Sequence, residues 1–233
     1  MSFLSNVFSS IISGEPSPST KEINLYIHAA RADDLDTVKA FCEKYPKSVD
    51  VGDYLDRTAL HGACHNLNVG IVDFLIKAGA DVSRPAIFSE TPLMAATASP
   101  RARSDALGHS DPEMGQKSLD IVTRLVAAGA DLNAQHQAWE KNGHYVKATG
   151  LTALMMATRF VRDDICNHLT RAGADPTLRD VNGRKASEQT EHGYMIDLME
   201  RAEKNWAQRK PPAPEASEWK GKVDPRMNSW QGH

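Results

Sequence analysis

The sequence contains few cysteines and few aromatic residues, and neither sign of charge is in large excess. Three of its 233 residues are cysteine, and aromatic residues make up 6%. An odd number of widely spaced cysteines excludes the disulfide framework of a small secreted domain. The formal net charge of −3 and the pI near 6.3 argue against a general binder of nucleic acid or of acidic membranes, because such binders need clustered lysine and arginine.

Long apolar runs are also missing from the sequence. No stretch approaches the roughly 18 consecutive apolar residues that a membrane-spanning helix needs. An apolar segment lies near the N-terminus, but no lysine or arginine precedes it as in a signal peptide, so we expect a cytoplasmic protein. Hydrophobic residues still make up 41%, and abundant alanine with few aromatics favours closely packed helices.

Two short motifs recur in a fixed order along the chain. The first motif reads TALHGA from Thr58, TPLMAA from Thr91 and TALMMA from Thr152, and the second reads AGAD from Ala78, Ala128 and Ala172. The first two copies begin 33 residues apart. The spacing is longer at two places, which predicts one insertion near residues 99–118, inside a repeat, and another near residues 134–150, between two repeats. Both insertions are expected to be loops.

The pattern resembles the ankyrin repeat, a unit of about 33 residues with a TPLHxA opening and two helices. Weaker copies near residues 24–38 and 180–186 extend the resemblance to residues 21–207, as about five repeats. The resemblance implies an all-α solenoid of stacked helix-turn-helix units with projecting finger loops between repeats. It also implies that no catalytic domain is attached.

The residues within each repeat fit this fold on physical grounds. The opening threonine suits a helix N-cap, because its hydroxyl accepts a hydrogen bond from a free backbone N–H. Ile71, Val72, Leu75 and Ile76 recur at helical spacing and predict a buried stripe. The glycine of the AGAD motif follows as a C-terminal residue with positive φ. A single helix pair cannot bury such a stripe, so neighbouring repeats must supply the core.

The two ends of the chain differ from the repeats. Residues 1–20 carry apolar side chains on one side of an expected helix, and we expect this arm to dock on the exposed end of the stack. The alternatives are a membrane-surface helix, a disordered segment or a partner contact. Ser19 and Glu22 form a capping box pattern. Residues 208–233 are proline-rich and polar, which predicts a disordered tail, and Trp219 and Trp230 leave open a short binding motif.

Several side chains are candidates for metal binding or catalysis. His61, Cys64 and His65 lie close together, but no further ligand is spaced to complete a metal site. The resemblance implies instead that His61 hydrogen-bonds the neighbouring backbone. Cys42 and Cys166 fall on hydrophobic positions, so all three thiols are interpreted as small buried hydrophobic groups.

The two insertions carry the other such candidates. His109, Asp111 and Glu113 lie in the first insertion, and His136 and His144 lie in the second. Neither set has the spacing of a known metal site. An enzyme would need both sets to converge, although the insertions attach at opposite edges of a repeat. We therefore expect no enzyme activity, cofactor or metal.

The resemblance favours a surface that binds another protein, formed by the finger loops and the exposed inner-helix positions. Aromatic and apolar residues on successive fingers would form a continuous stripe. Leu55 and Ile87 have a second interpretation, in which they pack against the next finger, and the long finger at residues 134–150 has one in which it packs on itself. The candidate partner-binding residues are Tyr54, Leu55, Arg57, His65, Asn66, Ile87, Phe88, Trp139, His144, Tyr145, Arg159, Phe160, Asn182 and Arg184, with Arg31 as a further exposed position.

The leading functional hypothesis is a non-catalytic module that binds and inhibits one partner protein through its concave face and fingers, as immunity proteins do. The alternative is a scaffold or adaptor that uses the tail as a second site. We expect a protein partner of unknown identity, no nucleic acid, no membrane span and a monomer in isolation.

Overall fold

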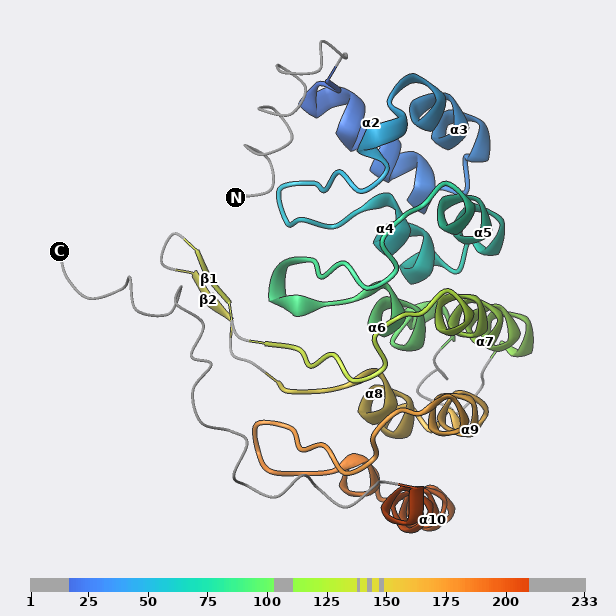
Figure 1. Ribbon diagram of the computed structural model, residues 1–233, viewed down its shortest axis with the longest axis vertical. Coiled ribbons are helices and arrows are strands. Elements are labelled where there is room, and N and C mark those ends of the chain that lie inside the picture. The colour runs from blue at the N-terminus through green and yellow to red at the C-terminus, as the bar shows by residue number, and fades with distance from the viewer. Residues whose placement is uncertain (1–16, 103–110, 138, 142–143, 147–148, 210–233) are drawn as a thin grey trace, which may run out of the picture.

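A computed structural model describes residues 17–102, 111–137, 139–141, 144–146 and 149–209. The described helices form a single stack of helix pairs that runs from the N-terminal to the C-terminal end (Figure 1). The predicted N-terminal arm up to residue 16, the tail from residue 210 and His109 lie outside the described residues.

Within the described part of the chain, four helix pairs follow one another and a fifth unit closes the stack. The all-α solenoid predicted from the repeats is confirmed, and a short β-hairpin is added to it. The pairs are α2 (Thr20–Arg31) with α3 (Leu35–Lys44), α4 (Ala59–Asn66) with α5 (Val69–Lys77), α6 (Pro92–Thr97) with α7 (Pro112–Ala127), and α8 (Ala153–Arg159) with α9 (Asp163–Ala172). The fifth unit consists of the 3₁₀ turn η4 (Ala186–Glu188) and α10 (Gly193–Arg209).

The residues expected at the helix ends cap the helices. The Thr58 side chain accepts a hydrogen bond from the backbone N–H of His61, and Thr91 and Thr152 cap α6 and α8 in the same way. Ser19 and Glu22 form the predicted capping box at the start of α2. The glycine of each AGAD motif has a φ between 86° and 108°, as expected of a residue that ends a helix in the left-handed region.

The core is formed by one repeated set of side chains on the outer helices. Ile71, Val72 and Leu75 of α5 are fully buried. The equivalent residues of α7 and α9 are fully buried too, and they are Ile121, Val122, Leu125, Ile165, Cys166 and Leu169. Burying one such side chain stabilises the fold by about 1.5–3 kcal/mol. Because these stripes lie between neighbouring pairs, the stack as a whole supplies the core that one pair lacks.

A ladder of hydrogen bonds joins the repeats where each outer helix ends. In each case, the backbone N–H of the aspartate in the AGAD motif donates to a side chain of the preceding repeat. The pairs are Asp81 with Asp50 at 3.1 Å, Asp131 with the Ser83 hydroxyl at 2.9 Å, and Asp175 with Asn133 Oδ1 at 2.8 Å. The acceptors occupy the same repeat position, so the ladder keeps the repeats in register.

Both insertions contain secondary structure in their described residues. The first was predicted as a loop to residue 118, and this is wrong from Pro112 onward, where α7 begins. Asp111 accepts hydrogen bonds from the backbone N–H groups of Glu113 and Met114, and a proline at the first helical position suits a helix start. The second insertion holds β1 (Trp139–Lys141) and β2 (His144–Val146), which pair antiparallel with Trp139 opposite Val146.

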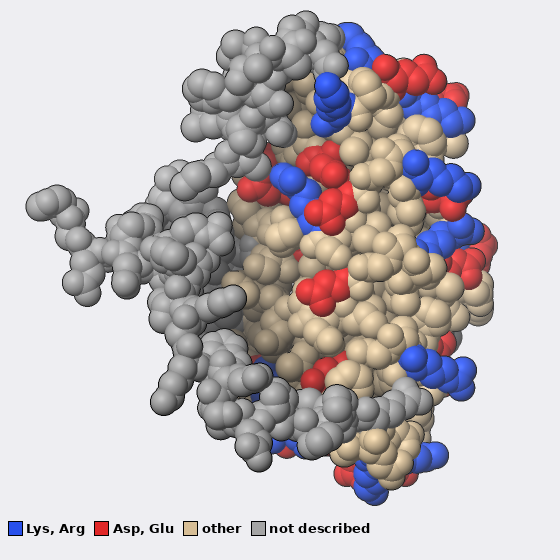
Figure 2. Space-filling model, viewed as in Figure 1, with Lys and Arg blue, Asp and Glu red and all other residues tan. Residues whose placement is uncertain are grey.

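Charged side chains of both signs alternate along the edge formed by the outer helices (Figure 2). Lys77 and Arg124 both pair with Asp73 at 2.6 Å. Such exposed pairs contribute little to stability, at most about 1 kcal/mol each. No helix in the described part of the chain is long and apolar enough to cross a membrane.

Candidate protein-binding site

The inner face of the stack is formed by the fingers and by the inner helices α2, α4, α6 and α8. Four fingers, at residues 50–58, 81–91, 131–152 and 175–185, connect one repeat to the next and project to the same side (Figure 1). The ladder ties each finger at its base, which holds that base at a defined position relative to the inner helices.

His61 fixes the second finger to α4. The backbone N–H of Thr58 donates to Nδ1 of His61 at 3.2 Å, so the ring proton lies on Nε2, which donates to the Glu90 carbonyl at 3.0 Å. The side chain is 3% exposed, and burial lowers the pKa of His61 to about 4. The neutral ring therefore acts as a structural link between repeats, as the resemblance implied.

Two fingers are closed by an aspartate–arginine pair. Asp53 accepts from Nε and Nη2 of Arg57 at 3.1 and 3.0 Å, and Asp180 accepts from the same atoms of Arg184 at the same distances. Burial raises the pKa of Asp180, but the hydrogen bonds from Gln189 and Arg184 outweigh it and hold that pKa at about 2. Two of the guanidinium nitrogens of Arg57 and of Arg184 are thus already hydrogen-bonded within their own fingers.

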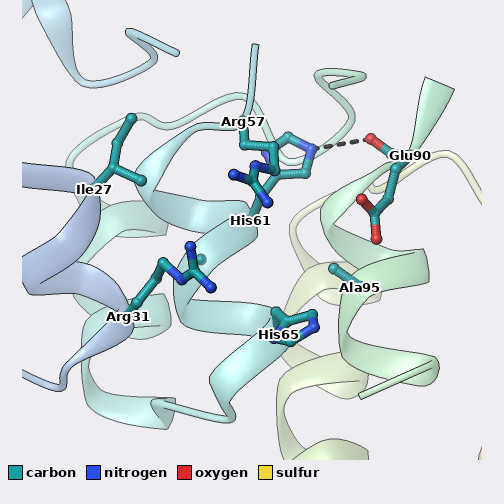
Figure 3. A pocket seen from close by; sticks show the side chains of 8 residues that line it. Ile27, Arg31, Arg57, His61, His65, Glu90 and Ala95 are labelled. Carbon is teal, nitrogen blue, oxygen red and sulfur yellow. Dashed lines mark hydrogen bonds between the residues drawn. The ribbon is translucent and has the colours of Figure 1, made fainter. Parts of the chain in front are cut away.

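A hollow of about 150 Å³ lies on the inner face between the first three repeats. It is lined by side chains of α2, α4 and α6 and of the first two fingers. Arg31 and Arg57 point toward it, and the carboxyl group of Glu90 lies on its other side (Figure 3). The lining residues are Ile27, Arg31, Arg57, His61, Gly62, His65, Glu90 and Ala95.

Several of the predicted contact residues are accessible. Tyr54, at the tip of the first finger, is 78% exposed. Arg31, His65, Arg159, Asn182 and Arg184 are exposed as well. Arg31, Arg57 and His65 meet at the hollow, whereas Arg159, Asn182 and Arg184 belong to later repeats and do not line it.

Other predicted contact residues take part in internal packing. Ile87 is only 7% exposed, and its N–H donates to the Leu55 carbonyl at 2.9 Å, so the prediction of Ile87 as an exposed contact is wrong. It packs toward the first finger, the alternative interpretation, and Leu55 is half-buried. Asn66 is half-buried and donates to the Gly62 carbonyl at 3.2 Å. Phe160 is half-buried where α8 ends.

The third finger is the longest and carries the β-hairpin. Gln135 Nε2 donates to the Gly150 carbonyl at 2.8 Å and to the Arg179 carbonyl at 2.9 Å, which ties the base of this finger to the fourth. Gly150 has a φ of +68°, and a Cβ there would lie 2.8 Å from the backbone nitrogen of Val181. The hairpin extends beyond the neighbouring fingers (Figure 1).

The side chains of four predicted contact residues lie outside the described part of the structure. They are Phe88, Trp139, His144 and Tyr145. The backbone places the last three on the hairpin, where Glu140 pairs with Tyr145 and Lys141 with His144. These four residues remain predictions.

The candidates for metal binding and catalysis have structural roles where they are described. Burial raises the pKa of the Cys42 and Cys64 thiols, and that of Cys166 to about 12, which makes each a poor nucleophile. Asp111 caps α7, and Glu113 pairs with Lys117 at 2.7 Å. Over the described ranges, no group of three or more histidine, cysteine, aspartate or glutamate side chains is arranged to hold a metal ion.

Four residues that line the hollow were not singled out from the sequence, and they are Ile27, Gly62, Glu90 and Ala95. Glu90 occupies the repeat position that Arg57 occupies one repeat earlier, directly before the capping threonine. Gly62 occupies the position of Ala95 and Met156. A glycine inside a short helix costs about 1 kcal/mol relative to alanine, so its presence was the available signal for a close approach.

Comparison with known proteins agrees with this architecture. The family model for ankyrin repeats, in three copies, matches residues 6–86 and 25–107. Neurogenic locus notch homolog protein 2 of Homo sapiens and that of Mus musculus are each 38% identical to the chain over 94 residues. These alignments cover 40% of this chain and 3% of each relative.

Ankyrin repeats are protein–protein interaction modules and are typically non-catalytic. The family match ends at residue 107, but the same pairing of helices continues to α10 at the end of the described chain. The threonine caps and the glycine positions recur in the order that the repeat requires, and His61 links two of the repeats. The chain thus contains ankyrin repeats, which the family model matches over residues 6–107, and its described helix pairs form a solenoid of the same type.

Proposed function

We propose that the chain is a non-catalytic binding protein that holds one partner protein against its inner face and inhibits it. The observation that carries this proposal is the third finger. Its hairpin extends beyond the neighbouring fingers (Figure 1). Tyr54 of the first finger and Arg31 and His65 of the inner helices are exposed. Long loops on a rigid scaffold are disproportionately used for binding.

The way in which the finger is anchored supports a binding role over self-packing. Gln135 and Gly150 join its base to the fourth finger, so a partner that contacts the hairpin meets a preorganised element. Preorganisation reduces the ordering cost of binding. Inhibition would then be steric, because the hairpin and the inner face together cover the partner's own functional surface.

A cytoplasmic location and a monomeric free state belong to the same proposal. The three cysteines are free thiols, and two of them are fully buried, which suits a reducing compartment. Both parts are checked by fractionation of cells that express the chain and by its mass in solution.

The experiment starts with crosslinking of the full chain to its partner in lysate of the source organism, followed by mass spectrometry. The variant Trp139→Ala with Tyr145→Ala is compared with Tyr194→Ala, which removes an exposed aromatic side chain of α10, away from the fingers. We expect the double variant to lose the partner and the control variant to keep it.

The captured partner is then assayed for its own activity with and without the chain. A stoichiometric loss of that activity supports inhibition. Retention of every partner by the double variant would contradict a binding role for the hairpin. A chain that ends at Arg209 separates the adaptor alternative, because an adaptor that uses the tail loses one partner and keeps another.

A further inference from the structure

The hollow on the inner face lies between two charged side chains, Arg31 and Glu90, that have no ion-pair partner among the described residues. Arg31 of α2 makes no ion pair and no side-chain hydrogen bond with the rest of the described chain, and the same holds for the carboxyl group of Glu90. Both side chains reach the hollow, Arg31 from one side and Glu90 from the other (Figure 3). One offers donors only, and the other offers acceptors when ionised.

Gly62 leaves room for the side chain of Arg31, because glycine has no Cβ. A Cβ built on Gly62 would lie 2.6 Å from Cγ of Arg31 and 3.4 Å from its Cδ. The aliphatic part of Arg31 therefore crosses α4 at Gly62, which carries its guanidinium group to the hollow. Alanine stands at the equivalent position of the next repeat, where it lines the hollow as Ala95.

Glu90 is half-buried, and its carboxyl group accepts no hydrogen bond from the described residues. Burial raises its pKa, and the charge of Arg57 opposes this only in part. Arg57 itself donates Nε and Nη2 to Asp53, so its charge is largely offset. A half-buried carboxylate without a donor costs free energy, which an incoming donor would recover.

The charges around the hollow select among the side chains that a partner can insert. A carboxylate would meet Arg31 but would be repelled by Glu90, and an ammonium group would meet Glu90 but would be repelled by Arg31. A primary amide is neutral, its oxygen accepts from a guanidinium group, and its nitrogen donates to a carboxylate. Of these three groups, only the amide can form hydrogen bonds with both Arg31 and Glu90 without repulsion.

We propose that the hollow lined by Arg31, Gly62 and Glu90 is a subsite for the side-chain amide of an asparagine or glutamine in the bound segment of the partner protein. The volume of about 150 Å³ accommodates a group of that size, and Ile27 and Ala95 contact its aliphatic stem. The subsite rests on the proposed binding function and gives it a chemical specificity.

The test uses the ¹⁵N-labelled full chain and four capped tripeptides, Ac-Ala-X-Ala-NH₂, in which X is glutamine, glutamate, lysine or norleucine. Norleucine measures the contribution of the stem and peptide backbone alone. In NMR titrations, we expect the glutamine peptide to shift the backbone signals of Gly62, His65 and Ala95. It should bind at least about threefold more tightly than the other three, since hydrogen bonds to charged groups are among the stronger ones.

Two charge variants should change the peptide preference in opposite directions, and a third variant should weaken glutamine binding. Glu90→Gln removes the repulsion and should make the glutamate peptide the tightest ligand, whereas Arg31→Met should favour the lysine peptide. Gly62→Ala displaces the Arg31 stem and should weaken glutamine binding. The matched control is Gly70→Ala, since no atom lies within 4 Å of a Cβ at Gly70.

The NMR spectrum of each variant reports whether the protein is folded. If the four peptides have the same order of affinity in wild type and in both charge variants, the subsite is overturned. It is also overturned if the shifted signals map elsewhere, or if no signal shifts at the highest soluble peptide concentration. A chain that inhibits its partner but shows no amide preference refutes the subsite alone. A chain that prefers the amide but captures no protein refutes the binding function.

Discussion

His61 makes the stability of the stack depend on pH in a direction that can be calculated. Its ring is 3% exposed, and its pKa falls from 6.5 to about 4 because burial disfavours the charged form. Between these values, the unfolded chain binds a proton that the folded chain does not bind. The stabilising contribution is therefore present above about pH 6.5 and is lost as the pH falls toward 4. From pH 7 to about pH 5, the loss amounts to about 2 kcal/mol.

The variant His61→Met isolates this contribution, because methionine is buried at the equivalent positions Met94 and Met155. At pH 7 the variant should be less stable by about 1–2 kcal/mol, since the Thr58 N–H loses its acceptor. Near pH 5 the two proteins should be almost equally stable, because wild type has lost its advantage and the variant has no ring to protonate.

Urea unfolding followed by circular dichroism at several pH values measures the difference in the free energy of unfolding. Groups that titrate in both proteins cancel in this difference. His28→Gln, at an exposed position of α2, controls for the loss of a histidine as such. If the gap between wild type and His61→Met is the same at pH 7 and near pH 5, the buried neutral ring is refuted.

Three further changes should alter the free energy of unfolding, each measured by the same urea titration. Gly150→Ala should destabilise by more than about 1 kcal/mol, because φ is +68° and the Cβ would meet Val181, whereas Gly70→Ala should be neutral or stabilising; equal effects would contradict this. Leu75→Ala leaves a cavity in a fully buried stripe and should lower the free energy of unfolding by about 2–5 kcal/mol. A loss below about 1 kcal/mol would exclude close packing there. Asp180→Ala removes a carboxylate of the fourth finger that accepts five hydrogen bonds, and it should cost about 2 kcal/mol, a penalty that an exposed loop would not show.

The sequence predicted the parts of this fold that local chemistry determines. A capping threonine and a helix-ending glycine act on their own neighbours, so their recurrence was sufficient to place the helices. The link from His61 to the Glu90 carbonyl followed from the family resemblance. The start of α7 was missed although Asp111 and Pro112 carry the signal, because the repeat spacing was taken to place the helix later.

Other features depend on contacts between repeats and could not be predicted from the sequence. Ile87 is buried, and its N–H donates to the Leu55 carbonyl of the first finger. The sequence left its exposure open, because burial there depends on how neighbouring fingers meet. The hollow combines Arg31, Gly62 and Glu90 from three repeats, and its geometry depends on how the repeats stack.

The hairpin had a local signal, the Asn142-Gly143 pair, which is typical of tight turns between strands.

The ladder between repeats has a consequence for how such a protein changes over time. Its bonds join Asp131 to Ser83 and Asp175 to Asn133, so they use the base of the third finger and no residue of the hairpin. The hairpin can therefore be lengthened, shortened or replaced while the register of the stack stays the same. Selection for a new partner can act on this finger without a matching change in the core, and the same property makes the finger a natural site for grafting a foreign binding loop.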